Sequence, residues 1–174
     1  DEGKVVGTSG YAQDITERKW TEEKIRESER LHASLVRSLP GFVYRCRNDR
    51  SWTMQYISKG CFAVTGYRPE ELINNRRISY NNLILSEYQK TLWRKWQKVL
   101  AQRESFEDQY PIRAAGGDIR WVWERGHGVF DKKGRLLFLE GYIEDVTERR
   151  RAEEALERSL SLRRATLEST ADGI

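Results

Sequence analysis

The spacing of apolar residues predicts three helices along the chain. Neither Gly nor Pro interrupts residues 17–39, and apolar side chains recur there at steps of three and four residues, which is typical of one helix face. The clearest helix is expected over residues 86–103, where a capping box of Ser86 and Gln89 would close its first turn. A charged stretch without helix breakers predicts a third helix over residues 148–168. The apolar stripe of the middle helix consists of Tyr88, Leu92, Trp96, Val99 and Leu100.

Between these helices the apolar pattern changes to that of β-strands. Aromatic and β-branched runs are joined by short polar or Gly-containing turns, which predicts antiparallel pairing. Residues 59–85 break into short helical turns, and Pro111 lacks a ladder donor, so its strand is expected at an edge or a bulge. We therefore predict an α+β fold, a five-stranded antiparallel sheet with short helices and one long helix on one face, flanked by N- and C-terminal linker helices. The predicted strands are residues 42–46, 52–58, 105–113, 119–130 and 135–146.

One segment of the chain occurs twice. Residues 10–18 have the sequence GYAQDITER and residues 141–149 have GYIEDVTER, so that Asp14 and Asp145 stand 131 positions apart. An ungapped match at a constant offset indicates an internal repeat. We expect residues 10–16, like their second copy, to end a strand before a helix begins. The predicted organisation is the tail of a preceding unit over residues 1–16, a linker helix over 17–39, a complete domain over 40–147, an exit linker helix over 148–168 and the start of a following unit over 169–174.

Composition and charge disfavour several classes of protein. Hydrophobic residues make up 38% and charged residues 33% of the chain, as in a globular domain with charge-rich helices. The net charge is +4, but Lys and Arg alternate with Glu and Asp along the linkers, which disfavours a nucleic-acid-binding surface. No apolar run approaches the length of a membrane-spanning helix, so we expect no direct membrane insertion of this segment. Cys46 and Cys61 form no motif, and reduced thiols in a cytoplasmic protein are expected.

Three motifs give the chain a resemblance to a known family. They are GYRPEEL at residues 66–72, GDIRWV at residues 117–122 and the repeated segment at residues 141–149. In this order and at these spacings they resemble the PAS domain with its carboxy-terminal PAC motif, and the resemblance covers about residues 30–150. Residues 169–174 resemble the opening of a further PAS domain, so that several tandem PAS units are expected. The resemblance implies a PAS-like sheet with its helices on one face.

The resemblance also implies a function. PAS domains are sensory and dimerisation modules of bacterial signalling proteins, commonly of histidine kinases or of cyclic-diguanylate enzymes. The chain is therefore expected to be a regulatory module of a sensor histidine kinase in a two-component phosphorelay, and to form a homodimer through its linker helices. Two alternatives stay open, a module of a diguanylate cyclase or phosphodiesterase and a dimerisation spacer that binds no ligand. No catalytic residue is expected in this segment, because no nucleophile–base pair or metal set can be assembled from it.

The candidate signal-relay residues stand where the last strand becomes the exit helix. By the family resemblance, Asp145 and Thr147 form a hydrogen-bonded joint that passes a change in the sheet to the helix. The alternative is an ordinary helix N-cap, and both can hold, because a cap that forms and breaks has two states. Gly141, inside the same strand, marks either a close approach of a helix or a ligand to the backbone, or a β-bulge.

Aromatic side chains supply the candidate ligand pocket. They suit a site for a small apolar or aromatic molecule that one or two polar groups orient. The alternative, which we favour, is a core packed with large rings, in which Trp121 or Trp123 faces a dimer partner. The candidate pocket residues are Tyr44, Tyr56, Trp93, Trp96, Tyr110, Trp121 and Trp123.

The sequence identifies no cofactor. A haem-binding PAS domain usually takes its ligand from the long helix, but residues 86–103 contain no histidine. A covalent flavin requires a cysteine after the GYRPEEL motif, and residues 74–85 contain none, so haem and covalent flavin are both disfavoured. No cluster of His, Cys, Asp and Glu has the spacing of a metal site. The two histidines, His32 and His127, are assigned neither to a metal nor to phosphorylation.

Overall fold

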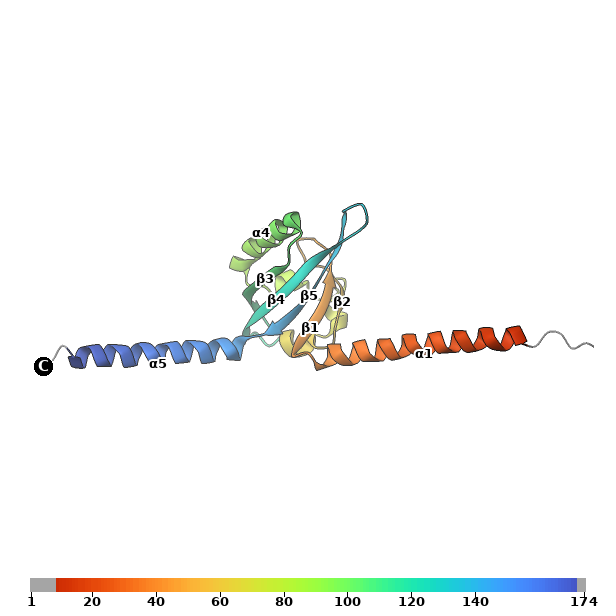
Figure 1. The fold of residues 1–174 in the computed structure, drawn as a ribbon. Coiled ribbons are helices and arrows are strands. Elements are labelled where there is room, and N and C mark those ends of the chain that lie inside the picture. The colour runs from red at the N-terminus through yellow and green to blue at the C-terminus, as the bar shows by residue number, and fades with distance from the viewer. Residues whose placement is uncertain (1–8, 172–174) are drawn as a thin grey trace, which may run out of the picture. The chain divides into compact units, whose positions relative to one another are not determined.

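The chain divides between Ser38 and Leu39 into two structural units. A computed structural model describes the backbone of residues 9–171 and the side chains of residues 17–164. The first unit contains helix α1 (Ser9–Ser38), and the second contains the sheet and the other helices (Figure 1). The elements of the second unit are β1 (Gly41–Cys46), β2 (Met54–Ile57), α2 (Cys61–Thr65), α3 (Pro69–Leu72), the 3-10 helix η1 (Tyr80–Asn82), α4 (Ser86–Gln102), β3 (Phe106–Arg113), β4 (Ile119–Phe130), β5 (Leu136–Asp145) and α5 (Thr147–Ala171).

Helix α1 begins earlier than the sequence predicts. The repeat predicts that residues 10–16 end a strand, but these residues lie inside α1, which begins at Ser9. The prediction is wrong for a physical reason. A strand must pair its backbone N–H and C=O groups with a neighbouring strand, whereas a helix pairs them within its own segment. The strands in the described part of the chain pair with one another, and none of them pairs with residues 10–16.

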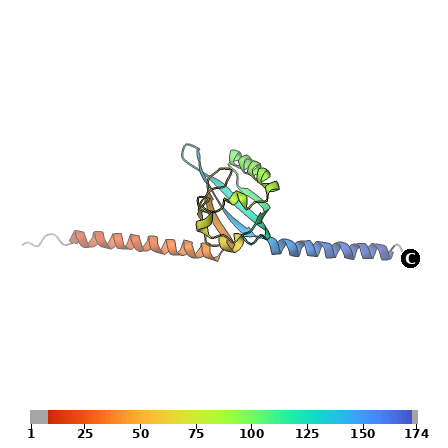
Figure 2. The same cartoon turned by 180° about the vertical axis from the view of Figure 1, so that it is seen from behind.

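The sheet is antiparallel throughout and its strands lie in the order β2-β1-β5-β4-β3. The predicted α+β fold is therefore confirmed, and Pro111 lies in an edge strand, β3, as its missing N–H requires. Strand β1 pairs with β5, with Gly41 opposite Glu144, so the first and last strands of the unit are neighbours. Seen from behind, the short helices lie in front of the sheet (Figure 2).

Helix α4 covers the inner face of the sheet with the apolar stripe that the sequence predicts. Leu92, Trp96 and Leu100 of this stripe are buried. The Trp96 ring stacks on Phe106 of β3, with ring centroids 4.4 Å apart and planes at 12°. Rings stacked in this way bury a large apolar area and fix the distance between helix and sheet. The largest fully buried side chains include Trp96, Tyr110, Phe42, Phe106, Met54, Leu72 and Leu83.

The start of α4 differs from the predicted capping box. Leu85 occupies the N-cap position and no side chain caps the helix, so Ser86 is already inside its first turn. The side chain of Gln89 reaches back and donates to the backbone carbonyls of Asn81 and Ile84, at 3.0 and 2.9 Å. The prediction is wrong because Gln89 pairs with the preceding turn, which the spacing of Ser and Gln alone does not reveal.

Two glycines opposite each other open the inner face of the sheet to a tyrosine. Gly126 of β4 pairs with Gly141 of β5, and the register is continuous there, so Gly141 does not mark a bulge. The Tyr44 hydroxyl crosses this pair and lies 2.9 and 2.7 Å from where a Cβ would stand on each glycine. A side chain of the core, rather than a helix or a ligand, therefore makes the close approach to Gly141. The absence of two side chains leaves the space that Tyr44 occupies.

We predict that Gly141→Ala destabilises the second unit by about 1–3 kcal/mol, because the added methyl group overpacks the core. Its Cβ would lie 2.7 Å from both the Arg125 carbonyl oxygen and the Tyr44 hydroxyl, and the former belongs to the backbone and cannot swing aside. Gly116→Ala is the matched control, because the nearest atom to its Cβ lies at 3.5 Å. Denaturant unfolding of both variants measures the difference. Equal free energies of unfolding for the two would contradict the packing argument.

Candidate functional site

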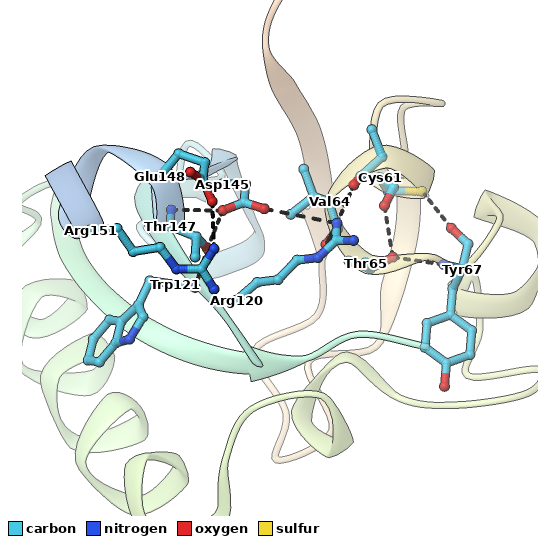
Figure 3. A network of polar contacts seen from close by, with 11 residues as sticks. Cys61, Val64, Thr65, Tyr67, Arg120, Trp121, Asp145, Thr147, Glu148 and Arg151 are labelled. Atoms are coloured by element: carbon cyan, nitrogen blue, oxygen red, sulfur yellow. Dashed lines mark hydrogen bonds and ion pairs between the residues drawn. The ribbon is translucent and has the colours of Figure 1, made fainter. Parts of the chain in front are cut away.

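The last strand passes into α5 through a group of hydrogen bonds that also holds β4 (Figure 3). The Asp145 carboxylate accepts from the backbone N–H of Thr147 at 2.9 Å and from its hydroxyl at 2.5 Å. The same Thr147 oxygen accepts from the backbone N–H of Trp121 at 2.9 Å. Beside it, the N–H of Val146 donates to the Trp121 carbonyl at 2.8 Å. Both backbone groups of Trp121 are thus paired with the start of α5. We call Trp121, Asp145, Val146 and Thr147 the junction.

Arg120 connects the junction to helix α2. Its Nη1 donates to the backbone carbonyls of Ala63 and Val64, at 2.5 and 3.0 Å, and lies 3.9 Å from the second oxygen of Asp145 (Figure 3). The last carbonyls of a helix lack partners within it, so a guanidinium with several donors suits them well. The Arg120–Asp145 ion pair is part-exposed and weak on its own. Its importance is geometric, because one side chain touches both α2 and the end of β5.

The first turn of α5 packs on the outer face of β4. The Arg150 guanidinium lies over the Trp121 ring, 3.8 Å from its centroid, and donates to the Gln109 side chain at 3.2 Å. Arg149 lies 3.9 Å from Glu144 of β5. A cation over an indole ring contributes about 0.5–1 kcal/mol at an exposed site. The start of α5 is therefore fastened to the sheet by its backbone and by its side chains together.

A buried carboxyl group lies at the centre of the inner face. Glu124 of β4 is 4% exposed and accepts from the Tyr44 hydroxyl at 2.5 Å and from the Tyr110 hydroxyl at 2.7 Å. The Tyr80 hydroxyl lies 3.2 Å from that of Tyr110. Burial raises the pKa of Glu124 to about 7, against the lowering effect of the two tyrosine hydrogen bonds. Burial likewise raises the pKa of Tyr44 and of Tyr110.

The cavity beside Glu124 is small. Its volume is about 10 Å³, which is room for about one water molecule. Of the candidate pocket residues, Tyr44, Trp96 and Tyr110 line it. These rings, with others of the core, fill most of the interior.

The other candidate pocket residues lie elsewhere. Trp93 packs on Trp52, with ring centroids 5.2 Å apart. Tyr56 and Trp123 line an open groove of about 750 Å³ on the outer face of the sheet. Trp121 also faces outward, against Arg150 of α5. The structure therefore distributes the predicted pocket over two faces of the sheet.

Two charged residues of β4 have no role in the sequence-based predictions. Arg120 and Glu124 share the inward side of the strand with Val122, because alternate residues of a strand face the same side. The sequence predicts Trp121 and Trp123 either as pocket residues or, in the favoured alternative, as rings of a packed core of which one faces a dimer partner. The alternation of residues along the strand could have identified both residues. Each stands two positions from Val122, and a charged residue on the same side as a buried valine must be paired by other polar groups.

Three further features were sought in the part of the chain that the structure describes: a metal site, reactive cysteines and a membrane-spanning helix. No group of three His, Cys, Asp or Glu side chains is arranged there to hold a metal ion. Cys46 and Cys61 are buried and free, and burial raises the pKa of the Cys61 thiol to about 12. The described helices include none that is long and apolar enough to cross a membrane.

Known proteins are similar to this chain in sequence and in fold. The family described as PAS fold matches residues 54–143. A methyl sulfide methyltransferase-associated sensor of Methanosarcina acetivorans is 27% identical over 160 residues, which is 90% of this chain and 16% of that sensor. A blue-light-activated histidine kinase of Brucella anthropi is 30% identical over 137 residues, which is 75% of this chain and 25% of that kinase. The chain therefore spans a quarter or less of the length of these curated relatives.

A solved structure supports the same relationship. A sensory box histidine kinase/response regulator from Burkholderia thailandensis E264 superimposes with a TM-score of 0.59 and 26% sequence identity. The match covers 78% of this chain and 97% of that one. Its extent indicates that the sheet and its helices correspond as a whole.

We predict that Thr147→Val lowers the free energy of unfolding by about 1–3 kcal/mol, because the Trp121 N–H loses its acceptor while the shape of the side chain is kept. Thr147→Ser keeps the hydroxyl and should recover most of the loss. Thr91→Val, at an exposed position of α4, is the control and should change stability by about 0.5 kcal/mol or less. Chemical denaturation compares the three. A Thr147→Val variant as stable as the Thr91→Val control would contradict the role of the hydroxyl.

Proposed function

The chain belongs to the family of PAS folds, and we propose that it is a sensory and regulatory module of a multi-domain signal-transduction protein, a cytoplasmic sensor histidine kinase. The kinase relatives from Brucella anthropi and Burkholderia thailandensis support this output. The repeated segment at residues 10–18 and 141–149 supports a tandem arrangement of such modules. In this proposal the chain itself catalyses no reaction, and it passes a change in its sheet to the next domain through α5.

The observation that carries the proposal is the pairing of both Trp121 backbone groups with the start of α5. A displacement of β4 relative to β5 must stretch or break these bonds, because Trp121 lies in β4 whereas Val146 and Thr147 follow directly after β5. Breaking them separates the first residue of α5 from β4 and frees α5 to change its direction. A contact between strand and helix that forms or breaks is thus a two-state element of the kind that relays a signal. Gly141 contributes indirectly in this scheme, by seating Tyr44 across β4 and β5.

We further propose that the linker helices pair in a homodimer. Leu156 and Leu160 of α5 are 61% and 56% exposed and stand four residues apart, on one helix face. In α1, Leu31 and Leu35 repeat the same spacing and are 58% and 56% exposed. Charged helices of this length owe most of their stability to packing an apolar face. A second copy of the chain would supply that packing, and would set one α5 beside the other at the point where the junction acts.

We predict that Leu160→Glu weakens self-association at least about tenfold, because burial of one leucine contributes about 1.5–3 kcal/mol. Ser161→Glu introduces the same side chain one position away, off the face of Leu156 and Leu160, and is the matched control. Analytical ultracentrifugation over a range of protein concentrations measures the dimer dissociation constant of each variant. A monomeric wild-type chain, or equal dissociation constants for the two variants, would overturn the proposed interface.

The test of the proposed output uses the full-length protein. We predict that Thr147→Val changes the rate of ATP-dependent histidine autophosphorylation by about fivefold or more, because the coupling between sites in such systems is about 1–3 kcal/mol. Thr91→Val serves as the control and should leave the rate unchanged. A dimerisation spacer would instead associate normally while its junction variant leaves the output unaltered. Formation of cyclic diguanylate from GTP, without autophosphorylation, would favour the diguanylate cyclase alternative.

A further inference from the structure

The core of the second unit contains a carboxyl group without a cation. Among the described residues, Glu124 is the one acidic or basic side chain that is buried, and the residues around its cavity include neither Lys nor Arg. Its oxygens are held by the hydroxyl groups of Tyr44 and Tyr110. An ionised carboxylate in such a place loses its hydration and has in return only these hydrogen bonds and one from the Trp96 side chain, without a counter-charge. The site therefore holds the neutral acid more readily than a surface glutamate does.

The buried tyrosine and cysteine side chains that face Glu124 do not compete with it for titration near neutral pH. Burial raises the pKa of Tyr44, of Tyr110 and of Cys46 well above their ordinary values, so these three stay protonated. Asp108 of β3 is paired with Lys95 of α4 at 2.6 Å, outside the cavity. The polar or titratable groups around Glu124 are Tyr44 and Cys46 of β1, Tyr80 of η1, Tyr110 and Asp108 of β3, and Trp96 of α4.

The tyrosines can accommodate either form of the acid. When Glu124 is ionised, Tyr44 and Tyr110 both donate to it. When Glu124 carries a proton, its O–H needs an acceptor, and a tyrosine oxygen supplies one if that hydroxyl turns. Tyr110 can turn because the Tyr80 hydroxyl stands 3.2 Å away and either oxygen of that pair can be the donor. The hydroxyl groups of Tyr110 and Tyr80 thus form a chain whose direction can reverse with the charge of Glu124.

The size of the cavity decides what this site can bind. About 10 Å³ excludes a metabolite, but a proton requires no space. We propose that the core of this module is a proton-binding site, in which Glu124 gains and loses a proton and the hydroxyl groups of Tyr110 and Tyr80 reorient with it. The proton passes between the carboxyl group and solvent water, and no bond other than O–H forms or breaks.

The link from this site to the output rests on the proposed function. Glu124 stands opposite Ile143 of β5, and two residues along β4 Val122 stands opposite Asp145. A charge that appears at Glu124 therefore acts on the two strands whose relative position the junction fixes. In this scheme, deprotonation moves β4 against β5 and loosens the bonds between Trp121 and Thr147.

A titration by carbon-13 NMR tests the site directly. We expect one carboxyl resonance with a midpoint near pH 7, and its absence from Glu124→Gln assigns it. Tyr110→Phe removes a donor from the ionised form and should raise the midpoint, while Tyr142→Phe, on the outer face, should leave it unchanged. Absence of any carboxyl titration near pH 7 in the wild type, or equal midpoints in these two tyrosine variants, would overturn the proposal.

A stability measurement gives an independent check with a fixed sign. The raised pKa of folded Glu124 means that the unfolded chain releases this proton first as pH rises, so stability falls between the ordinary pKa of 4.5 and about 7. Relative to Glu124→Gln, the unfolding equilibrium constant of the wild type should rise about tenfold per pH unit within that window and stay level outside it. A constant ratio across the window would contradict proton binding at this residue.

Two further measurements test whether the cavity holds a small cation and whether the site is linked to the junction. In the first, ammonium chloride replaces sodium chloride at equal ionic strength, and the midpoint of the Glu124 titration should not change. A lower midpoint would show that a small cation occupies the cavity and would overturn a proton-only site.

In the second, the amide resonances of Trp121 and Thr147 are followed in the same titration. They should shift with the Glu124 midpoint, but not in Glu124→Gln. Titration of the carboxyl group without these shifts would overturn the link to the junction. The response of the full-length output to Thr147→Val tests the proposed function separately.

Discussion

Trp121 has two backbone groups to pair at a point where β5 has already ended. The last β5 residue, Asp145, stands opposite Val122, so the ladder offers Trp121 no further strand residue. The Thr147 hydroxyl and the Val146 N–H take the place of that strand, at 2.9 and 2.8 Å. A buried or half-buried backbone group left unpaired costs about 1–3 kcal/mol, so the chain can leave the sheet at this point only if the junction is made. The position of α5 on the sheet depends on this requirement.

Strand β4 connects the junction to the rest of the unit through its two faces. On the inward face, Glu124 meets the tyrosines of the core and Arg120 meets the carbonyls of α2. On the outward face, Trp121 lies under the first turn of α5. One strand therefore touches the polar core, a short helix and the exit helix within five residues. In the proposed relay, this strand would pass a change at one of these contacts to the others.

The sheet, its edge strand and α4 could be predicted because each depends on local pattern: alternation, the missing N–H of Pro111, and a helical stripe. Asp145 and Thr147 could be found from the repeat and the family motif. Arg120 and Glu124 could not be given roles, because their partners come from α2, β1 and β3, far away in the sequence. The start of α1 was mispredicted for a related reason: whether a segment is a strand depends on whether another strand pairs with it. Two closely similar motifs therefore adopt different structures here.

The most direct measurement of the central claim is amide hydrogen exchange at the junction, residue by residue, in the unmodified protein. If the junction is a two-state element, the amide hydrogens of Trp121 and Val146 should exchange through one shared opening. The free energy of that opening should be lower than that of the amides in the middle of the β4–β5 ladder. Protection equal to that of the ladder would show a joint that opens only when the whole domain unfolds. Unrelated opening free energies for the two amides would show that the joint does not act as a unit, and either result would contradict the account.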